Sequence, residues 1–215
     1  MTSKQDGKPE TIKGEIGYYN LQDWWLSTFS QNERDHIESV YQPFGFSSSG
    51  SVNPRPLTQG DIDWTDGSIV GLLWGLSSWF NNSRDSELAK KMIKKAEEIG
   101  VTADDILDLH FAYAEKMAIY YRNKNNDPES LDVAIKAARD QIALATQAAK
   151  AFKEEYGDET LPSHAGYDQL HIILEKQGQY DEAIVLCEQA KYQGWNGRWD
   201  TIIESIKTKR DKANS

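Results

Sequence analysis

Cysteine, long apolar runs and signal-like segments are nearly or entirely missing from this sequence. Cys187 is the one cysteine in 215 residues, so no disulfide can form within the chain, and a reducing compartment is expected. No run of about 20 apolar residues could cross a bilayer. The polar start, MTSKQDGKPETIKGE, has no apolar core of the kind found in a signal peptide. We therefore predict a cytoplasmic protein without a membrane partner.

Positive charge is also scarce. The chain has 24 lysines and arginines against 34 acidic residues, which gives a net charge of -10. Because phosphate recognition needs a positive surface, nucleic acid is not an expected partner. A basic cluster near the C-terminus is explained more simply as cations that offset the dipole at the end of a helix. Its members are Lys207, Lys209, Arg210 and Lys212.

Motifs for catalysis and metal binding are missing as well. The sequence has no phosphate loop, dinucleotide fingerprint, nucleophile elbow or zinc-binding histidine pair. The histidines do not have the spacing of a metal site; they are His36, His110, His164 and His171. The acidic segment that precedes Gly67 fails as a calcium loop, because Leu72 stands where the loop needs a glutamate. We therefore predict no catalytic residues, no metal and no cofactor.

What the sequence does contain is helical periodicity along most of its length, with no alternation typical of a strand. We predict an all-α fold of eight or nine helices. Residues 1–16 are expected to be a disordered tail. Residues 17–100 form a tryptophan-rich helical region with a flexible loop at 43–60, which is rich in Ser, Gly and Pro. Residues 101–215 form helical hairpins and a C-terminal capping helix.

Tryptophans concentrate in apolar helical segments. The segment 61–80 is apolar on almost every side, which predicts a buried central helix. Four tryptophans are assigned to the core, since each ring buries a large area; they are Trp24, Trp25, Trp74 and Trp79. Two interpretations are open for Trp195 and Trp199: they pin the capping helix to its neighbour, or they offer an exposed anchor to a partner.

The clearest pattern lies at 163–194 and predicts two antiparallel helices. Leu170, Ile173 and Leu174 form an apolar stripe on the first helix. Ser163 is a candidate N-cap, and Gly178 can take the left-handed conformation just past the helix end. The second helix carries small and aliphatic residues at the same spacing: Ala183, Ile184, Cys187 and Ala190.

This hairpin resembles the tetratricopeptide repeat, a helix-turn-helix unit of about 34 residues. The residues that carry the resemblance are Tyr167, Leu170, Leu174, Gly178, Tyr180, Ala183, Ile184 and Ala190. The sequence departs from the repeat at His171, where the family has Gly or Ala, and in lacking the closing proline. We interpret the missing proline as the end of the array, followed by a capping helix that starts near Arg198. This helix turns three isoleucines inward: Ile202, Ile203 and Ile206.

One hairpin cannot bury its own apolar surface, so at least two neighbours are expected upstream. The helices predicted at 103–122 and 129–153 give a weaker match to the same repeat. Residues that can be placed on its pattern are Met117, Ala118, Tyr121, Ala134 and Ile135.

The resemblance implies that the first helices of successive hairpins line a groove that binds an extended peptide or a helix. Groove-facing positions of the clear hairpin are Asp168, Ile172, Glu175 and Lys176; those of the weaker hairpin are Glu115, Ile119, Arg122 and Asn123. This set is more acidic than basic, so we expect a protein or peptide partner of basic or mixed polarity.

The sequence thus favours a non-catalytic protein- or peptide-binding helical-repeat module. Two alternatives are open. The protein could inhibit another protein through its acidic surface, or it could be an enzyme or small-ligand receptor with a site between its two halves.

Overall fold

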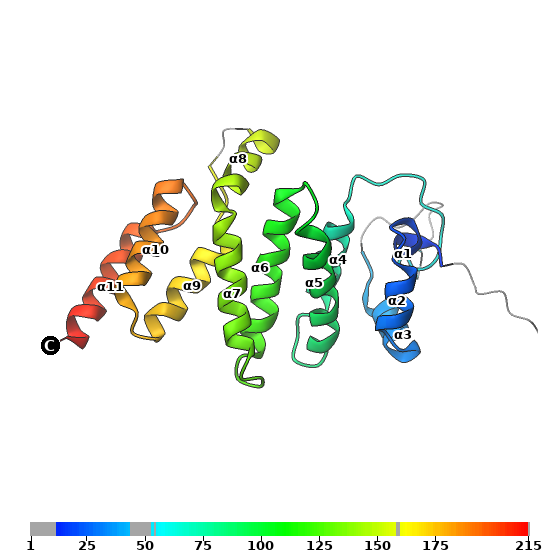
Figure 1. The fold of residues 1–215 in the computed structure, drawn as a ribbon, viewed down its shortest axis with the longest axis horizontal. Coiled ribbons are helices and arrows are strands. Elements are labelled where there is room, and N and C mark those ends of the chain that lie inside the picture. Colours follow the sequence, from blue (N-terminus) through cyan, green and yellow to red (C-terminus); the bar gives the residue numbers. More distant parts are fainter. Residues whose placement is uncertain (1–11, 44–52, 54, 158–159, 215) are drawn as a thin grey trace, which may run out of the picture. The chain divides into compact units, whose positions relative to one another are not determined.

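The structure is a computed structural model that describes residues 12–43, 53, 55–157 and 160–214. This part of the chain contains eleven helices and no strand; its one bridge joins Leu161 and Trp195 (Figure 1). The prediction of an all-α fold is therefore confirmed. Within the same residues, no helix is both long and apolar enough to cross a membrane.

The chain divides into two compact units, Met1–Ile69 and Val70–Ser215. The sequence placed a boundary near residue 100 instead. Helices of the first unit are α1 (Gly14–Tyr18), α2 (Gln22–Thr28) and α3 (Gln31–Val40). Helices of the second unit, apart from Ile69 itself, are α4 (Ile69–Trp79), α5 (Ser86–Gly100), α6 (Ile106–Asn123), α7 (Ser130–Ala143), α8 (Ala145–Tyr156), α9 (Ala165–Lys176), α10 (Tyr180–Gln193) and α11 (Trp199–Ala213).

Helix α1 was not predicted, and it depends on the segment 55–60. The Gly14 N–H donates to the carbonyl of Gly60 at 2.9 Å, and the Ile16 N–H donates to that of Leu57 at 2.8 Å. Backbone carbonyls thus satisfy the free N–H groups of the first turn. Residues 55–60, part of the expected flexible loop, are integral to the fold. Residues 44–52 and 54 of that loop, and 1–11 of the expected tail, lie outside the described residues.

The rest of the first unit follows the sequence closely. The Ser30 N–H donates to Glu33 Oε2 at 2.7 Å, and the Glu33 N–H donates to Ser30 Oγ at 3.3 Å, which forms a capping box at the start of α3. The buried apolar residues of this unit are Ile16, Leu21, Trp25, Phe29, Ile37, Tyr41 and Leu57. Trp25 is a core residue, as predicted.

Helix α4 is less buried than predicted. Leu73 and Leu76 are buried, but Trp79 is 41% exposed and Trp74 is only partly buried beside Phe111, with ring centroids 5.4 Å apart. Neighbours cover one side of the helix, so an apolar surface on every side does not mean burial on every side.

The helix predicted at 129–153 is two helices, α7 and α8, joined at Leu144. There the N–H of Leu144 donates to the carbonyl of Gln141 at 3.1 Å. This acceptor is three residues back along the chain, instead of the four that an α-helix has. Alanines of α7 are fully buried and permit close packing against α6 and α9: Ala134, Ala137 and Ala138. Along the second unit, α5, α6, α7, α9, α10 and α11 pack in chain order (Figure 1).

Candidate functional site

The α9–α10 hairpin forms where the sequence predicted it. His164, not Ser163, is the N-cap of α9: its Nδ1 accepts from the Tyr167 N–H at 3.3 Å. The assignment of the cap to Ser163 is therefore wrong by one residue. Gly178 has φ 75° directly after the helix, as predicted. Left-handed backbone of this kind favours glycine.

Helix α10 packs against α9 through small side chains. Ala183, Cys187 and Ala190 are fully buried, as is Tyr167 on the facing helix. Gly194, with φ 83°, ends α10 in the left-handed conformation. The predicted pair of helices is thus present, with the predicted residues in its seam.

Trp195 and Trp199 fix the start of α11. The Trp199 Nε1–H donates to the carbonyl of Trp195 at 2.7 Å, and both rings are buried. The Trp195 ring also stacks on His110, with an interplanar angle of 9°. Both tryptophans are therefore structural, and the alternative of an exposed anchor is wrong.

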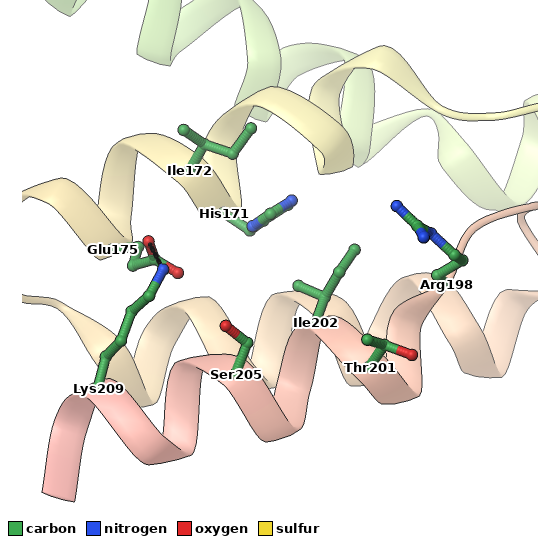
Figure 2. Close-up of a pocket in the computed structure, with 8 residues that line it drawn as sticks. All are labelled: His171, Ile172, Glu175, Arg198, Thr201, Ile202, Ser205 and Lys209. Atoms are coloured by element: carbon green, nitrogen blue, oxygen red, sulfur yellow. Dashed lines mark hydrogen bonds and ion pairs between the residues drawn. The ribbon is translucent and has the colours of Figure 1, made fainter.

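A groove of about 320 Å³ runs between α9 and α11 (Figure 2). Helix α9 contributes His171, Ile172 and Glu175. Helix α11 and its N-cap contribute Arg198, Thr201, Ile202, Ser205 and Lys209. We call this the α9–α11 groove.

The polarity of the α9–α11 groove changes along its length. Glu175 Oε1 and Lys209 Nζ form an ion pair at 2.6 Å across one end, and Arg198 stands at the other end (Figure 2). Among the described residues, Arg198 has no carboxylate partner. Ile202 projects into the middle, so an apolar centre lies between two charged ends.

His171 forms part of the α9 wall. Its side chain is 8% exposed, and its ring meets the Trp199 ring edge-on at 6.4 Å. Burial lowers the pKa of His171 below its usual value; Glu175 opposes this effect and Lys209 adds to it. The imidazole is therefore neutral at pH 7, and its Nδ1 has no hydrogen-bond partner within the described part of the chain.

The four residues predicted on the clear hairpin have different environments. Ile172, 37% exposed, and Glu175 line the α9–α11 groove. Asp168 is partly buried outside its lining, and burial raises the pKa of Asp168. Lys176 is exposed, and its Nζ donates to Tyr121 Oη at 3.5 Å. The structure therefore brings two of the four into one site.

The weaker hairpin does not present its predicted residues as a groove. Ile119 is fully buried and Asn123 nearly so, with Asn123 Nδ2 donating to the Ile119 carbonyl at 2.8 Å. Because α6 packs between α5 and α7, these two positions face neighbouring helices and cannot meet a partner. Their prediction as binding residues is wrong.

Glu115 and Arg122 were also predicted as groove residues of this hairpin. Both form hydrogen bonds with the side-chain amide of Asn81. Asn81 Nδ2 donates to Glu115 Oε1 at 3.1 Å, and Arg122 Nε donates to Asn81 Oδ1 at 2.9 Å. Burial raises the pKa of Glu115. Both side chains thus hold the α4–α5 connection.

The α11 side of the groove was not predicted from the sequence. Its residues have helical spacing: Arg198, Thr201, Ile202, Ser205 and Lys209. This stripe is displaced by one position from the buried stripe of Trp199, Ile203 and Ile206. From the sequence, Ile202 was expected in the core and Lys209 among cations that offset a helix dipole, although the displaced stripe was visible.

A buried polar cluster lies at the other end of α9. Gln141 Oε1 accepts from the Gly166 N–H at 2.7 Å, so its Nε2 faces the His110 carbonyl and His110 Nε2, each at 3.1 Å. The rings of His110 and His164 lie 4.9 Å apart. Burial lowers the pKa of His110 to about 4; burial, and then the nearby His110, lower that of His164 to about 3. Both are neutral at pH 7.

Comparison with protein-family models, curated proteins and solved structures finds no match for this chain. The resemblance to the tetratricopeptide repeat therefore depends on the residues of the α9–α10 hairpin alone. The described residues also contain no group of three or more His, Cys, Asp or Glu side chains that could hold a metal ion.

Proposed function

We propose that the protein is a non-catalytic helical-repeat module that binds a protein or peptide segment in the α9–α11 groove. The observation that supports this function is the row of exposed side chains on α11 that faces a second row on α9 across a cavity of about 320 Å³. In an array of helical hairpins these are the first helices of successive units, whose shared face is a binding surface.

The residues of the groove favour a partner of mixed polarity. Ile172 and Ile202 offer apolar contacts, whereas Thr201 and Ser205 offer hydroxyl groups that both donate and accept. A purely basic partner is less favoured than the sequence indicated, because the Glu175 carboxylate is already paired with Lys209. Recognition of an extended segment would combine an apolar side chain in the centre with polar contacts at the ends.

Affinity purification with groove variants tests this proposal. Ile172→Asp and Arg198→Glu change the apolar centre and one charged end without touching the hairpin seam. Val185→Asp is the matched control for the first, because Val185 is an exposed aliphatic residue of α10 outside the groove. Arg84→Glu is the control for the second, being an exposed arginine elsewhere.

The expected result is a set of co-purifying proteins that both groove variants lose and both controls retain. Each variant is first checked by circular dichroism to establish that it folds. Retention of the same partners by Ile172→Asp and Arg198→Glu would show that the α9–α11 groove is not the binding site.

Salt distinguishes this function from inhibition through the acidic surface. Binding in a groove with an apolar centre is expected to weaken only modestly as salt is raised, whereas attraction between an acidic surface and a basic site weakens strongly. The affinity of a purified partner at low and at high salt therefore separates the two.

A further inference from the structure

A second cavity, of about 700 Å³, lies within the first unit and is independent of the α9–α11 groove. Helices α2 and α3 and the segment 55–60 surround it. The residues that matter for its chemistry are Ile12, Leu26, Arg34, Glu38, Arg55 and Thr58.

A buried carboxyl group forms part of this cavity. Glu38 is only 3% exposed, and its Oε1 accepts from the Thr58 hydroxyl and lies 3.7 Å from Arg55 Nε. Its Oε2 has no hydrogen-bond partner among the described residues. A buried acceptor without a donor costs free energy, so a ligand that supplies a donor is favoured here.

Glu15 makes the same region still poorer in donors. Tyr41 Oη donates to Glu15 Oε1 at 3.5 Å, while Glu15 Oε2 is buried with no partner in the described part of the chain. Burial, together with the negative charge of Glu38, raises the pKa of Glu15 to about 7, and burial also raises that of Glu38. A positive group beside Glu38 would relieve both effects.

Two arginines also line the cavity, and one of them, Arg55, lies beside Glu38. Arg34 donates to Gln31 Oε1 at 2.8 Å and to the Phe29 carbonyl, but it has no carboxylate partner among the described residues. Arg55 Nη2 donates to Asp35 Oδ1 at 3.1 Å, whereas its Nε is buried without a hydrogen bond. The cavity lining thus contains a carboxylate oxygen without a donor, Glu38 Oε2, and a guanidinium N–H without an acceptor, that of Arg55 Nε.

From this arrangement we infer that the first unit binds a free amino acid with an aliphatic side chain. The ammonium group pairs with the Glu38 carboxylate, since an ammonium brings three donors and no acceptor. The carboxylate accepts from the guanidinium groups of Arg34 and Arg55, which suit its planar geometry. The aliphatic side chain packs against Ile12 and Leu26, the latter 52% exposed.

Calorimetric titration of the full chain with L-leucine tests the inference, with two analogues that each remove one charged group. L-leucinamide lacks the carboxylate and N-acetyl-L-leucine lacks the ammonium. Because a hydrogen bond to a charged group contributes about 1.5–3 kcal/mol, each analogue is expected to bind about tenfold or more weakly. No binding of leucine at millimolar concentration, or equal binding of either analogue, would overturn the inference.

Variants locate the site. Glu38→Gln and Arg34→Gln are each expected to weaken leucine binding about tenfold or more, for the same reason. Glu98→Gln on α5 and Arg84→Gln are the matched controls, because both side chains are exposed and lie outside the cavity. Unchanged leucine affinity in folded Glu38→Gln would place the ligand elsewhere and overturn the assignment. If the Glu38 variant does not fold, the two analogues on the unaltered protein still decide the outcome.

Discussion

Acid should destabilise the second unit through its two buried histidines. His110 and His164 have pKa values of about 4 and about 3 in the folded chain, against 6.5 for an ordinary histidine. Below pH 6.5 the unfolded chain therefore binds more protons than the folded one, and stability falls as the pH falls. At pH 5 the loss is about 2 kcal/mol for each histidine and about 4 kcal/mol for the pair.

The histidine contribution can be isolated with a double variant. His110→Gln and His164→Asn remove both titrating rings, and asparagine at 164 keeps an N-cap residue for α9. Urea unfolding at pH 7.5 and at pH 5 gives the free energy of unfolding of each form. The unaltered chain should lose about 4 kcal/mol more than the double variant over this interval. Carboxyl groups titrate equally in both forms, so their effects cancel in the difference.

His36→Gln is the control, because His36 lies on α3 outside this histidine pair. It should leave the pH dependence of the second unit unchanged. If the double variant were as sensitive to acid as the unaltered chain, the two histidines would not be buried in neutral form. The arrangement described for the polar cluster around Gln141 would then be wrong.

Three further predictions concern packing and charge. Gly166→Ala should lower the free energy of unfolding by about 1–3 kcal/mol, because its Cβ would lie 2.8 Å from Gln141 Oε1. Gly75→Ala is the control: its Cβ meets nothing within 4 Å, so urea unfolding should show no loss. Trp199→Ala should cost about 3–5 kcal/mol and speed hydrogen exchange in α11; unchanged exchange would contradict its anchoring role. The folded pKa of Glu15 is about 7, against 4.5 ordinarily, so the first unit loses stability as the pH rises from 4.5 to about 7. At pH 8 the loss is about 3 kcal/mol. Glu15→Gln should abolish it, as measured by amide exchange in α1–α3.

Local signals made the α9–α10 hairpin predictable. Gly178 needs a left-handed backbone that few other residues adopt, and small residues such as Ala183 and Ala190 mark where two helices meet. These features act within a few residues of chain, so the sequence alone contains them. The capping box of Ser30 and Glu33 was predictable for the same reason.

Features that depend on distant neighbours were not predictable. Nothing in the residues around Leu144 marks the break between α7 and α8, since none of residues 140–150 is Gly or Pro. Helix α1 requires the carbonyls of residues more than forty positions away. The prediction that Ile119 faces a groove was wrong for the same reason, because its burial depends on how α5 and α7 flank α6.

The candidate groove was half predictable. Ile172 and Glu175 follow from the spacing of the hairpin, but the facing residues belong to a helix that was interpreted as a cap. A capping helix is expected to bury one stripe, here that of Ile203 and Ile206. The neighbouring stripe, which ends at Lys209, was therefore not assigned to a site. The pairing of Lys209 with Glu175 is a contact between helices, which residue spacing within one helix does not contain.

Gln141 connects three helices through its side-chain amide, a role that its position in the sequence does not indicate. Its amide oxygen holds the start of α9 and its amide nitrogen faces α6, while its own backbone sits where α7 gives way to α8. A glutamate there would lack the donor, and a methionine would lack both groups. A single amide on α7 therefore links the first turn of the hairpin to α6.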